Sequence, residues 1–185
     1  MRLTLLIARA RRPVRRLLRD KRGISAVEFA MLLPLMVTLY LGCVETSTGI
    51  AIDRKVTLVA RSLGDLVAQA TTITNDEMTN ILNASAAVVQ PYQDSSLRIT
   101  VSSVAIDAGG VAKIAWSETK NGTALTVGTT VTLPAALNTA STSLIWAQAQ
   151  YTYTPTIGYV ITGPMNLTDQ IYMRPRLSDT VTRTP

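Results

Sequence analysis

The chain has 185 residues, with 18 Lys and Arg, 12 Asp and Glu, a single Cys and no His. This composition excludes an intramolecular disulfide and leaves no ligand set for a transition metal. Nine of the basic residues and only one acid lie in residues 1–23. The rest of the chain is therefore slightly acidic, with no basic surplus for nucleic-acid phosphates.

Residues 1–23 are predicted to form a basic cytoplasmic leader, and residues 24–44 a transmembrane segment whose one ionisable side chain is Glu28. About 20 apolar residues suffice to cross the hydrocarbon core as a helix. Because Lys and Arg beside a membrane helix stay cytoplasmic, the C-terminal part is expected on the opposite side of the membrane. No secretory cleavage site follows the apolar run cleanly, so we expect the segment to be retained.

Pro34 lies inside the apolar run and is predicted to kink its helix, because it lacks an N–H group. The kink is either incidental or a local bend that lets subunits pack together.

Residues 45–70 are predicted to continue the helix beyond the membrane. Their apolar residues recur at spacings of three and four, as on one face of an amphipathic helix: Ile52, Val56, Val59, Leu63, Leu66, Val67 and Ala70. Gly49 and Gly64 are weak points in this prediction, since each costs a helix about 1 kcal/mol relative to Ala.

Residues 71–185 are predicted to form a globular head. Thr74 and Glu77 have the spacing of a capping box, and the helix that follows should end at Gln90–Pro91. Alternating patterns predict strands over residues 97–106, with a bulge at Ser102–Ser103, and over 111–118, 144–154 and, at the sheet edge, 167–174. Residues 123–143 are predicted to form a loop with a helical turn at 135–138. The expected class is α+β: a long N-terminal helix and a second helix packed on a small antiparallel sheet.

A fixed spacing marks the start of the apolar run. Gly23 is followed by Ile24 and three more residues, then by Glu28 and Phe29. This resembles the cleavage motif of prepilins. With the basic residues before it and Pro34 after it, the segment is most similar to TadE-like minor pseudopilins of the tight-adherence (Tad) pilus system. The similarity extends over residues 19–60 and, more weakly, to residues 151–155 and 173–176.

The resemblance implies a pilin-like fold and cleavage between Gly23 and Ile24 by a prepilin peptidase. It implies that Glu28 neutralises the new amine of Ile24 in a neighbouring subunit; alternatively, Glu28 only reaches toward the lipid headgroups. Other implied partners are pilin and pseudopilin subunits, bound through the transmembrane helix, and an inner-membrane assembly platform.

The sequence contains no nucleophile elbow, P-loop or dinucleotide fingerprint, so no enzyme activity, catalytic residue, cofactor or metal is expected. The predicted function is that of a minor pseudopilin in Tad-type pilus assembly, cell adhesion or secretion. The alternative is a permanently anchored single-pass scaffold of a secretion apparatus. An exported, membrane-tethered hydrolase is disfavoured because the catalytic sets are missing.

Overall fold

The computed structural model describes residues 22–155, 158 and 162–184. The chain divides into two compact units, Met1–Val44 and Glu45–Pro185, which are called the N-terminal and C-terminal units below. Helix α2 (Arg22–Ala68) contributes its first part to the N-terminal unit and its second part to the C-terminal unit. The predicted leader, apart from its last two residues, lies outside the described part of the chain.

The second part of α2 is the central helix of the C-terminal unit. Its fully buried side chains follow the predicted stripe and include Ile52, Val56, Val59, Leu63 and Val67. The amphipathic helix is therefore confirmed. Two members of the stripe were assigned wrongly: Leu66 is 38% exposed, and Ala70 lies beyond the end of the helix.

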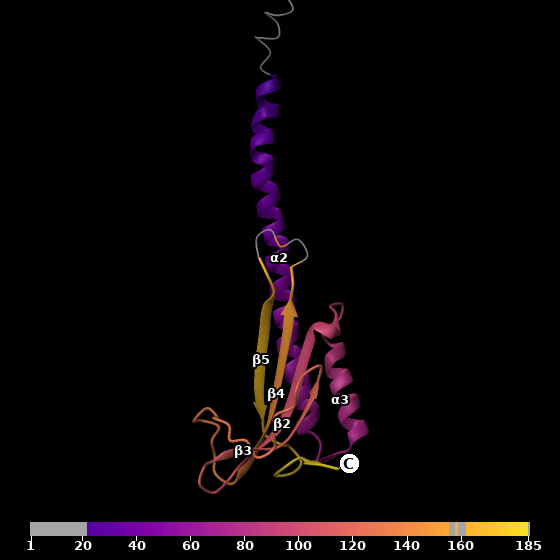
Figure 1. The fold of residues 1–185 in the computed structure, drawn as a ribbon, viewed down its shortest axis with the longest axis vertical. Helices are drawn as coiled ribbons and strands as arrows, with labels where there is room; N and C mark the ends of the chain where they lie inside the picture. The colour runs from indigo at the N-terminus through magenta and orange to yellow at the C-terminus, as the bar shows by residue number, and fades with distance from the viewer. Residues whose placement is uncertain (1–21, 156–157, 159–161, 185) are drawn as a thin grey trace, which may run out of the picture. The chain divides into compact units, whose positions relative to one another are not determined.

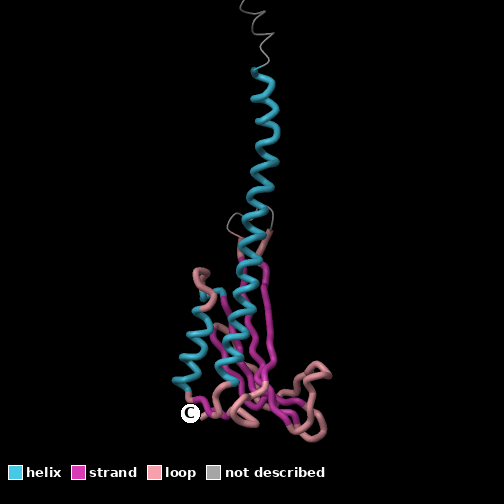
Figure 2. Tube along the Cα trace, turned by 180° about the vertical axis from the view of Figure 1, so that it is seen from behind, coloured by secondary structure: helices cyan, strands magenta, loops and turns pink. Residues whose placement is uncertain are grey.

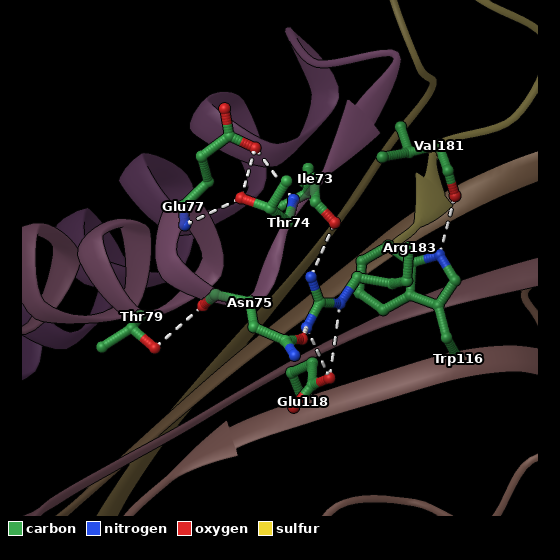
Figure 3. Close-up of polar contacts among 9 residues, drawn as sticks. All are labelled: Ile73, Thr74, Asn75, Glu77, Thr79, Trp116, Glu118, Val181 and Arg183. Atoms are coloured by element: carbon green, nitrogen blue, oxygen red, sulfur yellow. Dashed lines mark hydrogen bonds and ion pairs between the residues drawn. The ribbon is translucent and has the colours of Figure 1, made fainter. Parts of the chain in front are cut away.

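Helix α3 (Asn75–Ala87) begins with the predicted capping box (Figure 3). The backbone N–H of Glu77 donates to Thr74 Oγ1 at 3.3 Å, and the N–H of Thr74 donates to Glu77 Oε2 at 2.8 Å. The helix ends three residues before the predicted Gln90. Beyond Ala87 the backbone tightens, since the N–H groups of Val89 and Gln90 bond to carbonyls three residues back.

After a 3₁₀ turn η1 (Asp94–Ser96), four strands form one antiparallel sheet in the order β3-β2-β4-β5. The strands are β2 (Leu97–Ile106), β3 (Ala112–Lys120), β4 (Thr142–Tyr153) and β5 (Met165–Met173). Within the C-terminal unit, α2 and α3 cover one face of this sheet (Figures 1 and 2). The predicted α+β class is thus confirmed, with β5 at the edge.

One local prediction in this sheet needs correction. The bulge lies in β3, because Ser103 faces Trp116 while Val104 faces Ile114, which leaves Ala115 unpaired. The expected helical turn at 135–138 is confirmed: the N–H of Leu137 donates to the Pro134 carbonyl at 2.8 Å, and the N–H of Asn138 donates to the Ala135 carbonyl at 3.4 Å. The loop around it covers a second, smaller core on the outward face of the sheet, formed by Val104, Ile106, Ala112, Ile114 and Leu144.

The C-terminal residues return to the start of the unit, which the sequence did not predict. Strand β6 (Thr182–Arg183) pairs in parallel with β1 (Thr72–Ile73). Trp116 Nε1 donates to the Val181 carbonyl at 2.7 Å, and the Arg183 guanidinium donates to the Ile73 carbonyl at 2.7 Å (Figure 3). Two-residue strands carry no period, so no sequence pattern marked them.

Close packing explains one of the two helical glycines. A Cβ on Gly64 would lie 3.3 Å from Ile171 Cγ2 and from Met173 Sδ, and 3.4 Å from Ala147 Cβ. The absence of a side chain therefore lets α2 approach β4 and β5 closely, which offsets the helical cost of glycine.

Candidate functional site

The described part of the N-terminal unit is an apolar helix with no core of its own. An 18-residue window of this helix has a mean hydropathy of 1.9, and none of it is buried. Among its exposed side chains are Val27, Met31, Leu35 and Leu39. Soluble proteins rarely leave so large an apolar surface uncovered. The helix is long and apolar enough to cross a bilayer, which fits a single-pass membrane protein.

Gly23 is the second residue of α2 and is exposed. A Cβ placed on it would meet no atom within 4 Å. The described residues therefore make no demand for glycine at this position. If glycine is required at this position, the requirement comes from another molecule.

The Gly23–Ile24 bond lies among the first described residues of α2. Ile24 itself is 53% exposed. No described residue therefore covers this side chain fully, and another molecule could reach it.

Glu28 lies four residues after Ile24 and therefore on the same face of α2. Its side chain is exposed, and Phe29 beside it is exposed as well. None of the ion pairs between described residues includes Glu28. A cation that neutralises this carboxylate must come from outside the described chain, or from a new amine at Ile24.

Pro34 does not interrupt the helix, since α2 is continuous on both sides of it. Thr38 Oγ1 donates to the Pro34 carbonyl at 2.8 Å, a side-chain bond to the backbone of the preceding turn of the same helix. Any bend at Pro34 therefore occurs in a segment that stays helical.

Glu45, which sequence reasoning missed, is a buried acid at the start of the C-terminal unit and is only 3% exposed. Its Oε1 accepts the backbone N–H of Gly158 at 2.7 Å, and Tyr153 Oη donates to its carbonyl at 3.3 Å. Burial and then the nearby Glu45 charge raise the pKa of Tyr153. Glu45 lies four residues before buried Gly49, in phase with the apolar stripe of α2, and this spacing could have indicated its burial.

An open groove of about 500 Å³ lies on the sheet of the C-terminal unit, between residues of β2, β4 and β5. Hydroxyl and carboxamide side chains dominate its lining, and its charged members are Arg98 and Asp169. In the described part of the chain, no three His, Cys, Asp or Glu side chains come close enough to hold a metal ion.

Comparison with known proteins finds a family match for the N-terminal segment. Residues 23–62 match the family model described as TadE-like protein, and the match begins at the predicted cleavage glycine. No curated protein and no solved structure matches the chain. The resemblance drawn from the Gly23, Glu28 and Pro34 pattern is thereby confirmed. Over residues 23–62 the chain is similar to the TadE-like family, whose members belong to the Tad pilus system, and the apolar helix within this match fits a single-pass membrane protein.

Proposed function

We propose that this chain is a minor pseudopilin, cleaved by a prepilin peptidase between Gly23 and Ile24, and that it takes part in Tad-type pilus assembly, cell adhesion or secretion. One observation carries the proposal: in the described chain, an exposed glycine that no neighbour requires stands five residues before an exposed acid that joins none of the ion pairs, beside an uncovered apolar helix. The protein acts as a structural component and not as an enzyme.

The proposed topology follows from charge. The basic leader stays in the cytoplasm, residues 24–44 cross the inner membrane, and the C-terminal unit stands in the periplasm or on the cell surface. Packing between apolar helices would then hold the chain among other pilin and pseudopilin subunits on the assembly platform.

Cleavage would create a cationic partner for Glu28, which joins none of the ion pairs between described residues. Water adds to the Gly23 carbonyl, the C–N bond breaks, and Ile24 keeps the nitrogen as a new α-amino group. An amine of this kind has an ordinary pKa near 8 and is a cation at neutral pH. An unpaired amine and an unpaired carboxylate are both costly in lipid. Pairing them, within one helix or between neighbouring subunits, removes both costs and fixes the register of the helices.

The cleavage step is tested with Gly23→Ala, expressed as the full chain with its peptidase. We expect the precursor to accumulate uncut, because the added methyl group meets no described atom within 4 Å and would instead interfere with the protease. Gly49→Ala is the matched control: its new Cβ would make ordinary contacts of 3.7 Å and longer with the Tyr153 ring, so cleavage should proceed. Intact mass distinguishes the two forms. A Gly23→Ala chain that still loses the leader would contradict the proposal.

The assembly step is tested with Glu28→Ala. This variant should be inserted and cleaved but should fail to support pili, whereas Ser25→Ala in the same segment should assemble normally. Pili are counted in the material sheared from the cell surface, and the amount of the protein is measured there and in the membrane fraction. Normal pilus numbers with Glu28→Ala would refute the pairing role. A wild-type protein found uncut and only in the membrane would favour the anchored scaffold instead.

A further inference from the structure

The two edges of the sheet in the C-terminal unit are treated differently by the chain. At the β3 edge, Val131 donates its N–H to the Ala112 carbonyl at 2.9 Å, and Ile114 donates to the Thr129 carbonyl at 3.0 Å. The bulge at Ala115 and the charged residues Lys113 and Lys120 add to this cover. Covering segments, bulges and lysines are the devices by which proteins keep an edge from pairing with another chain.

Among the described residues, the β5 edge has no covering segment, no bulge and no lysine, and its one charged side chain is Asp169. β5 pairs with β4 alone, over nine residues and without a register shift. Met165–Met173 contains no Pro, Lys or Arg. Two side-chain hydrogen bonds, from Trp146 to Gln170 and from Thr152 to Asn166, join β5 to β4, and Asp169 Oδ1 accepts the N–H of Gln170 within the strand. Every second residue of an edge strand turns its N–H and C=O away from its neighbour, so part of the β5 backbone faces outward.

The side chains of β5 define what could pair there. Leu167 and Ile171 pack on the main core but remain half-buried, and Asp169 lies between them on the same face, opposite Ala149. Asp169 Oδ1 accepts the N–H of its neighbour Gln170 at 2.7 Å. No ion pair in the described chain includes Asp169. An added strand would therefore place apolar residues beside Leu167 and Ile171 and a basic residue opposite Asp169.

A second copy of β5 does not meet this requirement. In an antiparallel pair, residues opposite one another share a face of the sheet, so Asp169 could only face the odd-numbered side chains of the other copy. Those side chains are Met165, Leu167, Asp169, Ile171 and Met173, and none is basic. When two copies pair over the whole length of Met165–Met173, Asp169 lies directly opposite Asp169, and like charges at opposite positions are unfavourable.

We propose that β5 is a docking edge for an extended strand of a different polypeptide, one with apolar residues at alternate positions and a Lys or Arg opposite Asp169. Such a strand would complete the backbone hydrogen bonds of the edge, and the acid would set its register. The proposal goes beyond the proposed function and does not depend on cleavage after Gly23.

The test uses the full chain in detergent micelles and synthetic nine-residue peptides with blocked ends. The first peptide alternates Val and Thr with Lys in place of the central Val; the second has Glu at that position. We expect the Lys peptide to bind about threefold to tenfold more tightly, as a change from a like to an opposite cross-strand charge implies. Hydrogen exchange should slow at the amides of β5 and not at those of β3.

Matched variants isolate the role of Asp169. Asp169→Lys should invert the preference between the two peptides, and Asp169→Asn should abolish it. Asp53→Lys makes the same change of net charge at an exposed position of α2 and should leave the preference intact. The proposal is overturned if neither peptide binds, if binding leaves the β5 amides unprotected, or if Asp53→Lys acts like Asp169→Lys. It is also overturned if a peptide of Met165–Met173 binds as tightly as the Lys peptide, because the partner would then be a second copy.

Discussion

Removal of the Arg183 side chain should destabilise the C-terminal unit far more than removal of Arg176, although each arginine makes one ion pair. The Arg183 side chain is 14% exposed and holds three parts of the unit together. It donates to the Ile73 carbonyl at 2.7 Å, to Asn75 Oδ1 at 2.8 Å and to Glu118 Oε1 at 3.0 Å. The side chains of Arg176 and its partner Asp65 are 58% and 39% exposed.

The magnitudes follow from these surroundings. Hydrogen bonds from a charged donor are worth about 1.5–3 kcal/mol, but the Glu118 side chain is 40% exposed, so its share is discounted for solvent screening. We therefore expect Arg183→Ala to cost about 2–3 kcal/mol. Arg183→Lys should cost less, since it keeps the charge but loses the planar fork. An exposed pair such as Arg176–Asp65 is worth about 0–1 kcal/mol.

Urea unfolding of the full chain in micelles measures these costs. Both Trp residues of the protein, Trp116 and Trp146, lie in the C-terminal unit, so their fluorescence reports on that unit alone. With a slope of about 1–3 kcal/mol per M, Arg183→Ala should lower the urea midpoint by about 1 M or more. A midpoint no lower than that of Arg176→Ala would refute the view that Arg183 fastens the C-terminal strand.

Three further predictions concern the same unit and the same assay. Leu63→Ala, at a fully buried site, should cost about 2–5 kcal/mol, while Leu66→Ala, at an exposed site of the same helix, should cost under about 1 kcal/mol; equal costs would contradict the observed phase of α2. Gly64→Val should cost about 1–3 kcal/mol by overpacking α2 against the sheet, and an unchanged midpoint would refute close contact there. The backbone N–H and then the hydroxyl of Thr74 hold the pKa of Glu77 below its ordinary value of 4.5, so its contribution to stability is present above about pH 4.5 and is lost as the pH falls through the lowered pKa. Thr74→Ala, which removes the hydroxyl, should make stability less dependent on pH in this window, and an unaltered pH profile would count against the capping box.

Local patterns predicted the parts of the fold that local forces determine. The stripe of α2, the Thr74–Glu77 capping box and the alternation of β4 each follow from residues a few positions apart. The pairing of β1 with β6 joins residues that are 110 positions apart, such as Thr72 and Thr182. No spacing in the sequence indicates this pairing.

The candidate site shows the same division. The spacing of Gly23 and Glu28 is local and was found in the sequence. The structure adds that no described residue packs against the position of a Cβ on Gly23, and that no ion pair between described residues includes Glu28. The burial of Glu45 could have been read from its phase with the stripe of α2, but its hydrogen-bond partner, Gly158, lies 113 residues away and no local pattern indicates it. The sequence could not show that the two edges of the sheet differ, because the segment that covers β3 is a loop without a strand pattern.

Two measurements on the mature protein purified from its membrane test the central claim most directly: its intact mass and the sequence of its first residues. If Glu28 awaits a new amine, the mature chain begins at Ile24 and lacks residues 1–23. A mature chain that keeps its basic leader, or that begins at any other residue, would contradict the account.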